Sequence, residues 1–145
     1  IIFAATDLLA DTKLAPELSN EAHYYRAKAY LDAGKTDGAM EDLKVLAKDT
    51  RNVYRAEAKY KVAQIYFDGG QTDKAEQEVL NYIEVSTPHT YWLARSFVLL
   101  ADVYMKLGRN LDAKQYLLSL KQNYQADDDI AGMIESRLEK LKTEN

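Results

Sequence analysis

The sequence has no cysteine, only two prolines and six glycines, and no long apolar run. Without cysteine there can be no disulfide, no thiolate metal ligand and no thiol nucleophile. No stretch approaches the roughly 18 to 20 apolar residues that a helix needs to cross a bilayer. An excess of positive charge is also lacking, because 19 basic residues stand against 23 acidic ones, a formal net charge of −4. No overall positive field therefore favours nucleic acid or an anionic membrane as a partner.

The 145 residues instead combine apolar and charged side chains in the proportions of a globular helical protein. Hydrophobic residues make up 47% and charged residues 29%, which predicts one domain with a continuous core rather than a disordered chain. The sequence begins Ile1, Ile2, Phe3, with neither an initiator methionine nor the basic segment of a signal peptide. We therefore expect it to be part of a longer chain.

Three segments of the sequence repeat one another. Each has an alanine, a tyrosine three residues later and a glycine four residues after that, at 27–34, 63–70 and 101–108. A further alanine follows five residues after each glycine, at Ala39, Ala75 and Ala113. The glycines are 36 and 38 residues apart (70−34 and 108−70), so the units differ in length only where they join. Repetition at this period predicts a stack of similar supersecondary units.

Each unit is predicted to fold as a helical hairpin. Glycine adopts the left-handed conformation that closes a helix, so the first helices are expected to end at Gly34, Gly70 and Gly108. The second helices are expected to begin with a side chain that caps backbone N–H groups, at Thr36, Thr72 and Asn110. The recurrent alanines leave room for two helices to cross closely, while tyrosines and leucines fill the space around the crossing.

The sequence predicts one further helix at each end of the three units. Ala5 precedes Ala39 by 34 residues, so residues 1–15 are expected to form the second helix of a truncated repeat. At the other end, three aspartates at 127–129 lead into an apolar stripe at helical spacing, which predicts a capping helix over 126–145. We expect a single domain, residues 1–145, with its repeats at 16–50, 51–86 and 87–125.

The spacing of alanine, tyrosine, glycine and alanine resembles the tetratricopeptide repeat, whose usual unit is about 34 residues long. The resemblance covers roughly residues 19 to 124. The sequence departs from the family in its longer period and in having His23, Lys59 or Phe97 where the family usually has tryptophan. The resemblance implies an all-α solenoid, a right-handed superhelix of antiparallel hairpins, in which the first helices line a concave surface.

The resemblance also implies which side chains face a partner on that surface. Carried over position by position, these partner-binding residues are Tyr24, Lys28, Leu31, Tyr60, Gln64, Phe67, Arg95, Val98, Asp102 and Met105. We expect an apolar and aromatic strip with charges of both signs beside it, which would accept an apolar or helical peptide. The alternative is that many of these side chains pack only against the neighbouring unit.

Some members of the family bind a C-terminal carboxylate through a clamp of lysine and asparagine side chains. Here Lys28 stands where that clamp needs asparagine, and Tyr24 stands where it needs a cation. We therefore do not expect this sequence to bind a partner in that way.

No residue pattern in the sequence predicts catalysis, a cofactor or a metal. His23 and His89 are the only histidines, and without cysteine a zinc site would need several carboxylates to converge. The side chain of His23 is expected to pack in a partly buried position. The three aspartates at 127–129 lack the alternation and turn glycine of a calcium loop, and a negatively charged helix N-terminus explains them better. We predict neither an enzyme nor a cofactor-dependent protein.

The predicted function is a protein–protein interaction scaffold that binds a peptide or partner protein. The alternatives are a structural spacer or self-assembling segment of a larger multi-repeat protein, and, more distantly, an accessory domain of an enzyme. A homo-oligomer would form through the exposed N-terminal half-repeat. The long units also resemble tetratricopeptide proteins of the bacterial cell envelope. That resemblance implies a periplasmic or envelope-associated location, with the cytoplasm as the alternative.

Overall fold

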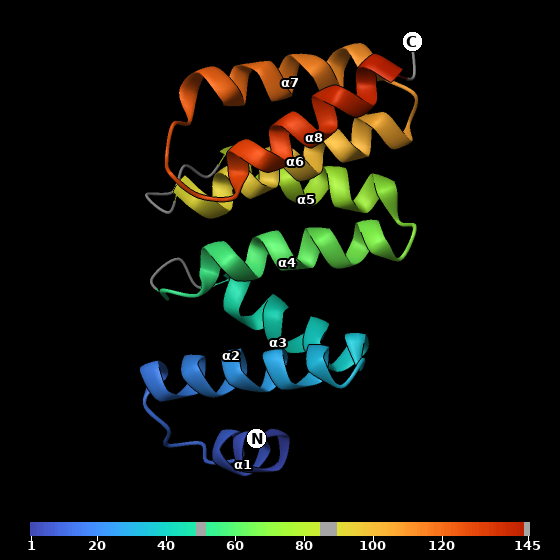
Figure 1. Ribbon diagram of the computed structural model, residues 1–145. Helices are drawn as coiled ribbons and strands as arrows, with labels where there is room; N and C mark the ends of the chain where they lie inside the picture. Colours follow the sequence, from blue (N-terminus) through green and yellow to red (C-terminus); the bar gives the residue numbers. More distant parts are fainter. Residues whose placement is uncertain (49–51, 85–89, 144–145) are drawn as a thin grey trace.

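The computed structural model describes residues 1–48, 52–84 and 90–143. Within them the chain forms eight α-helices and no strand: α1 (Ile2–Leu9), α2 (Pro16–Asp32), α3 (Thr36–Lys48), α4 (Arg55–Asp68), α5 (Thr72–Glu84), α6 (Thr90–Lys106), α7 (Asn110–Asn123) and α8 (Ile130–Thr143). Figure 1 shows them stacked from α1 at one end to α7 and α8 at the other. The prediction of an all-helical solenoid of hairpins with a C-terminal capping helix is confirmed. The expected repeat boundaries at 50/51 and 86/87 lie outside the described residues.

The three glycines end the first helices of the hairpins as expected. Gly34, Gly70 and Gly108 have φ angles of 74°, 80° and 78°, the left-handed conformation. In the first turn, the N–H of Lys35 donates to the carbonyl of Tyr30 at 2.8 Å, and the N–H of Gly34 donates to that of Leu31 at 3.1 Å. The same pair of bonds recurs after Gly70 and Gly108. This pattern satisfies carbonyls that the helix end would leave free and turns the chain back for the second helix.

The expected capping role of Asn110 is wrong. Helix α7 begins at Asn110, but the residue in the capping position is Arg109, which makes no side-chain capping bond. The buried Oδ1 atom of Asn110 has no hydrogen-bond partner among the described residues. The reason is the tight turn, which leaves one residue between Gly108 and the helix. Asn110 is therefore already helical, and its side chain is one position too late to reach the free N–H groups.

The interior is divided into two apolar clusters that meet at α4. The smaller cluster lies between α2, α3 and α4 and consists of Ala27, Ala39, Leu43, Leu46, Ala58 and Val62. The larger runs from α4 to α8, beginning with Tyr60 and Ala63 and ending with Ile134 and Leu141. Helix α4 thus presents one side to each cluster. Alanines stand at the helix crossings of both, as the close approach of two helices requires.

The first helices of the hairpins are not evenly spaced. Helices α4 and α6 lie side by side, with Cα atoms within 8 Å of each other, and α8 reaches α6 in the same way. No Cα atoms of α2 and α4, which both lie within the described residues, come that close. The gap between α2 and α4 is therefore filled by side chains. None of the helices in the described part of the chain has both the length and the apolar character needed to span a bilayer.

A buried charged group holds the first hairpin together. Asp42 of α3 is 1% exposed and accepts two hydrogen bonds from the Arg26 guanidinium of α2, at 2.6 and 2.8 Å. His23 Nδ1 lies 2.7 Å from the same carboxylate, and its side chain is partly buried, as expected. Burial on its own would raise the pKa of Asp42, but the bonds from Arg26 and His23 outweigh it and lower that pKa.

Candidate partner-binding surface

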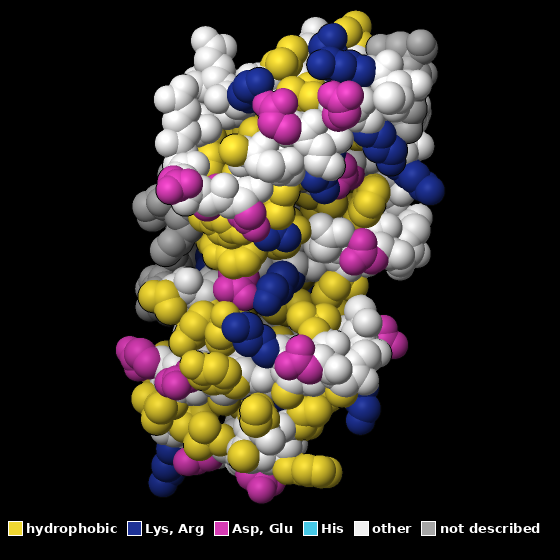
Figure 2. Space-filling model, viewed as in Figure 1, with side chains coloured by type: hydrophobic (Ala, Val, Ile, Leu, Met, Phe, Trp, Pro, Cys, Tyr) yellow, Lys and Arg dark blue, Asp and Glu magenta, His cyan; other side chains and the backbone are white. Residues whose placement is uncertain are grey.

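Helices α2, α4, α6 and α8 together form one face of the molecule, here called the first-helix face. Side chains on successive helices bond across it. The Tyr24 hydroxyl donates to Glu57 at 3.0 Å, and Arg137 makes a two-bond ion pair with Asp102 at 2.7 and 2.9 Å. Figure 2 shows apolar side chains lying among charged ones along the viewed side. The face is therefore mixed in character rather than continuously apolar.

Two of the predicted partner-binding residues are buried, so for them the alternative, packing against the neighbouring unit, holds. Tyr60 is 6% exposed and Val98 is 3% exposed, and both belong to the larger apolar cluster. The reason is the close approach of α4 and α6, which covers the side chains that point between these helices. Neither residue can offer much surface to a partner. Both side chains lie beneath the face and support the residues that are exposed on it.

The other predicted apolar residues remain partly open. Leu31 and Tyr24 pack beside the smaller cluster, and Phe67 and Met105 pack beside the larger one, each with only part of its side chain covered. Lys28 is exposed, with its Nζ atom 4.8 Å from the centroid of the Tyr24 ring. Gln64, Arg95 and Asp102 are half-buried. Arg95 and Asp102 bond to neighbouring helices, whereas Gln64 bonds to Tyr60 of its own helix. The structure thus splits the predicted set into contact residues and supporting residues.

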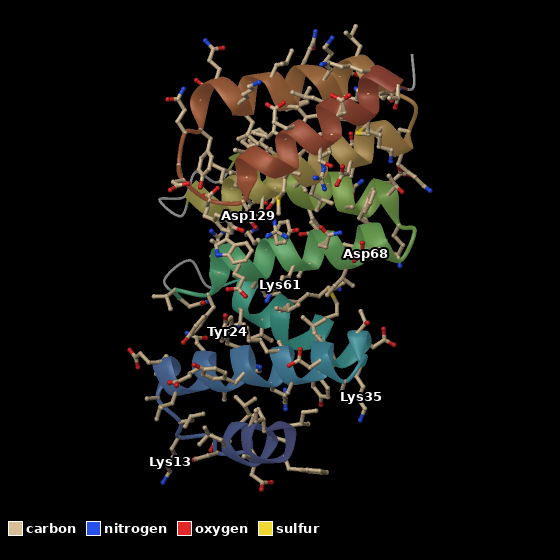
Figure 3. The ribbon with its side chains drawn as sticks, in the orientation of Figure 1. Lys13, Tyr24, Lys35, Lys61, Asp68 and Asp129 are labelled. Carbon is tan, nitrogen blue, oxygen red and sulfur yellow. The ribbon has the colours of Figure 1, made fainter. Side chains whose placement is uncertain are left out.

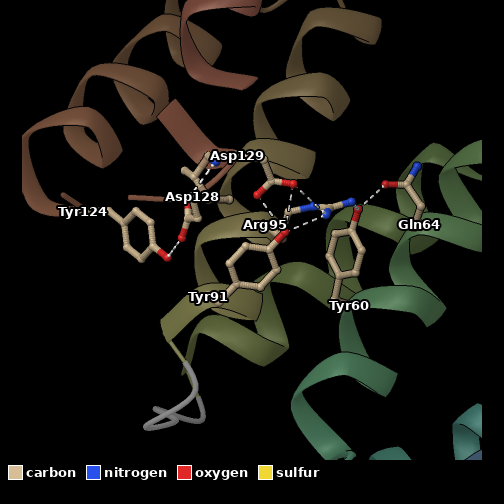
Figure 4. A network of polar contacts seen from close by, with 8 residues as sticks. Tyr60, Gln64, Tyr91, Arg95, Tyr124, Asp128 and Asp129 are labelled. Carbon is tan, nitrogen blue, oxygen red and sulfur yellow. Dashed lines mark hydrogen bonds and ion pairs between the residues drawn. The ribbon is translucent and has the colours of Figure 1, made fainter. Parts of the chain in front are cut away.

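A polar network fastens the C-terminal end of this face. Arg95 donates to the hydroxyls of Tyr60 and Tyr91 at 2.9 and 3.0 Å, and its guanidinium carbon lies 4.9 Å from the centroid of the Tyr60 ring. The Tyr91 hydroxyl donates in turn to Asp129 at 2.8 Å, and the Tyr60 hydroxyl donates to Gln64 at 2.8 Å (Figure 4). Burial raises the pKa of Tyr91, which keeps this hydroxyl a donor. The network joins α4, α6 and the start of α8.

Of the three aspartates before α8, Asp128 bonds to the helix N-terminus, as expected. Asp128 Oδ1 accepts the N–H of Ile130 at 2.9 Å, and Asp128 Oδ2 accepts the Tyr124 hydroxyl. The bond to Asp128 and burial together raise the pKa of Tyr124 to about 12. Among the described residues, no three side chains of histidine, cysteine, aspartate or glutamate gather as a metal ion would require.

The gap between α2 and α4 is bridged by aromatic and charged side chains. The Tyr24 ring stacks on the ring of Tyr54, which precedes α4, with centroids 4.1 Å apart. Glu57, which accepts the Tyr24 hydroxyl, also pairs with Lys61 at 2.6 Å. Figure 3 shows Tyr24 and Lys61 in the space between the two helices. Tyr54 therefore packs between two repeats, and Trp92 packs in the same way beside Tyr60, with centroids 5.5 Å apart.

Two pockets open on or beside the first-helix face. One, of about 350 Å³, lies at the start of α2 and is lined by Pro16, Glu17, Asn20, Glu21, Asn52, Val53 and Tyr54. The other, of about 560 Å³, lies at the far ends of α4 and α6 against α8, with Phe67, Asp102, Met105, Lys106, Ser136, Arg137 and Lys140 around it. Both volumes fall in the range of about 300 to 1,000 Å³ that is common for binding pockets. The first pocket is acidic and the second is basic.

Reasoning from the sequence missed the residues that α8 brings to this face. Arg137 lies 35 residues after Asp102, and Arg95 lies 35 residues after Tyr60. The bonded pairs that link α4 to α6 and α6 to α8 thus have the same sequence separation, and α8 lies beside α6 as a further first helix would. Extending the repeat register past residue 124 would have found Arg137 and Lys140. The bond of Glu57 to Tyr24 depends on the spacing of α2 and α4, which the sequence does not give.

Comparison with known proteins adds to this geometry. Residues 21–49 and 94–123 each match a family model described as "Tetratricopeptide repeat". Among solved structures, a crystal structure of MamA is similar, with a TM-score of 0.63 and 22% sequence identity over 99% of this chain and 88% of that one. At that identity the likeness shows the fold. The comparison with curated protein sequences finds no match.

Proposed function

Because this chain belongs to the tetratricopeptide-repeat family, we propose that it is a protein-interaction scaffold whose partner binds along the first-helix face. Repeats of this family generally bind proteins or peptides, and their stacked hairpins present an extended surface for binding. The fold is typical of non-catalytic scaffolds. The proposal places the partner on α2, α4 and α6.

One observation carries the proposal. Tyr24, Leu31, Phe67 and Met105 come from three successive first helices, and each leaves part of an apolar side chain open on the same face. Charged groups stand beside them, including exposed Lys28. Apolar anchors with a polar rim are the usual composition of a binding patch, in which a few anchors contribute most of the free energy of binding.

The supporting residues give these anchors a fixed geometry. Tyr60 and Val98 fill the space below the face, while Arg95 links α4 to α6 through Tyr60. A patch that is already ordered loses less conformational entropy when a partner binds. We propose no catalytic step, because the strongest polar network on the face joins its side chains to one another and serves to hold three helices.

The proposal is tested by photo-crosslinking in cells. A photoreactive amino acid placed at Leu31 or at Phe67 is expected to capture the same partner. The matched controls are Val45 of α3 and Leu118 of α7, apolar residues that are 44% and 45% exposed but lie on second helices. The double variant Leu31→Ser, Phe67→Ser is expected to lose that partner while keeping its helical circular dichroism. Equal capture from Val45 or Leu118 would contradict the proposal.

Self-association is a second candidate, favoured by the exposed apolar side chains of α1. Phe3 of α1 and Ile1, which precedes the helix, are 86% and 78% exposed, which is unusual for large apolar residues so close together. A second copy of the chain would cover them. Sedimentation equilibrium tests this candidate: a dimer that the variant Phe3→Ser converts to monomer supports it, and a wild-type chain that stays monomeric at high concentration rejects it.

A further inference from the structure

The basic pocket between α4, α6 and α8 has a charge that its own residues leave uncompensated. Asp102, its only acidic lining residue, is neutralised by Arg137 through two bonds of 2.7 and 2.9 Å. Lys106 and Lys140 are exposed, and neither forms an ion pair with any residue that the structure describes. Two ammonium groups therefore remain available beside the cavity.

The floor of this pocket is apolar. Phe67 from α4 and Met105 from α6 line it, and both pack from below against the larger apolar cluster. Methionine is a flexible and polarisable side chain that adapts to irregular apolar groups. With a volume of about 560 Å³, the cavity has room for one large apolar side chain and parts of its neighbours.

Arg137 holds the wall of the pocket rather than a ligand. Its Nε and Nη2 atoms bond to Asp102, and its Nη1 atom donates to the carbonyl of Met133 at 3.1 Å. This keeps Lys140, one turn further along α8, on the same side of the helix as the pocket. The capping helix therefore builds part of the binding surface as well as ending the stack.

We propose that this pocket binds a segment of a partner protein in which an apolar side chain is flanked by carboxylates. The apolar side chain would lie on Phe67 and Met105, and the carboxylates would pair with Lys106 and Lys140. A nucleic acid fits less well, because the floor is apolar and the chain as a whole carries a net charge of −4. The inference rests on the proposed function and adds to it the chemistry of the partner.

The carboxylates of the proposed ligand are those of side chains in an internal segment. The probe is therefore a synthetic peptide, Glu-Glu-Leu-Glu-Glu, with both termini blocked so that it carries no terminal carboxylate. Two matched peptides replace its central leucine with serine, or its four glutamates with lysines. Binding is followed by two-dimensional NMR of the isotope-labelled chain, with the Met105 methyl group as the reporter of the floor.

The glutamate–leucine peptide is expected to shift the Met105 methyl resonance and the amides of Lys106 and Lys140 in a saturable way. The serine peptide should bind at least about tenfold more weakly, the loss expected when one buried apolar side chain is removed. The lysine peptide should not bind. Raising the salt concentration to about 1 M should weaken binding of the glutamate peptide, because the two exposed ion pairs are then screened.

Charge reversal separates this pocket from the rest of the surface. The double variant Lys106→Glu, Lys140→Glu should lose at least tenfold in affinity for the peptide. The control variant Lys48→Glu, Lys114→Glu changes the net charge by the same amount, at exposed residues of second helices. It should keep the wild-type affinity for the peptide. Equal affinity for all three peptides, no shift of the Met105 methyl group, or no effect of the Lys106 and Lys140 variant would each overturn the inference. Crosslinking of a partner at Leu31 and Phe67 would then still support the scaffold function.

Discussion

The first hairpin and the rest of the molecule are held together by different forces. Helices α2 and α3 share a small apolar cluster, and at its edge the buried Asp42 is bonded to Arg26 and His23. From α4 to α8 the interior is a larger apolar cluster, and the ion pair between Asp102 and Arg137 lies at its surface, with side chains 24% and 27% exposed. The N-terminal end therefore depends on buried charge, and the C-terminal end depends on burial of apolar area.

The two regions also differ in how the first helices meet. Helices α4 and α6 lie close together along the face, whereas α2 and α4 touch only through side chains such as Tyr24 and Glu57. Local stability follows the number and burial of such contacts. We infer that α2 is the part of the binding face that adjusts to a partner, and that α4, α6 and α8 form the part that is fixed. Four measurements test this difference between the two regions.

The largest effect is expected from removal of the buried carboxylate. Asp42→Ala leaves Arg26 and His23 without their partner in a nearly dry site, and breaking a buried ion pair in this way costs about 3–5 kcal/mol. The matched variant Asp102→Ala breaks a partly exposed pair and should cost about 1 kcal/mol or less. Urea unfolding of both variants measures the difference. Similar losses would show that the two ends are not held by different forces.

Overpacking a helix crossing should have the next largest effect. Ala101 is fully buried in the larger cluster, so Ala101→Leu forces neighbouring side chains apart and should lower the free energy of unfolding by about 1–3 kcal/mol. Ala27 stands at the equivalent crossing of the first hairpin, beside a smaller cluster in which fewer buried side chains would be displaced. We expect Ala27→Leu to lower the melting temperature less. The reverse order would place the rigid region at the N-terminal end.

Acid should loosen the first hairpin before the rest. The pKa of Asp42 is lowered in the folded chain, so its stabilising contribution is complete above the unfolded pKa of about 4 and is lost as the pH falls through the folded value. Hydrogen exchange between pH 5 and pH 2.5, corrected for the intrinsic exchange rate, should show amides of α2 and α3 losing protection first. Earlier loss in α6 or α7 would refute this order.

The smallest effect is expected from the hydroxyl of Tyr24. Tyr24→Phe keeps the stacking on Tyr54 and removes only the bond to Glu57, which should cost about 0.5–1.5 kcal/mol. Because that bond joins α2 to α4, amide exchange should rise in α2 while remaining unchanged in α6. A uniform rise along the chain would mean that the first hairpin does not open separately.

Much of the fold could be predicted because it depends on local constraints. The left-handed turns at Gly34, Gly70 and Gly108, and the alanines at the helix crossings, follow from residue type and spacing alone. Those signals repeat three times, which fixed the hairpins and their order. The error at Asn110 came from a shift of one residue, which a turn pattern in the sequence cannot resolve.

The binding face could be predicted only in part, because exposure depends on distances between repeats. Tyr24 and Tyr60 occupy equivalent positions, yet Tyr60 is buried where α4 meets α6 and Tyr24 stays partly open where α2 and α4 stand apart. No spacing in the sequence encodes that difference. The role of α8 in the basic pocket was missed for a similar reason, since Lys140 lies beyond the last unit with a matching glycine. The cell-envelope location stays a prediction from resemblance.

The ion pair between Arg137 and Asp102 has a consequence for how such an array changes length. It joins α8 to α6, the first helix of the last hairpin. Whole hairpins could therefore be inserted or deleted ahead of α8 without altering the joint that terminates the solenoid. The basic pocket would keep the residues that belong to that joint, while the number of hairpins between α1 and the joint changed. In such a design the length of the scaffold and the chemistry of its terminal pocket can vary independently.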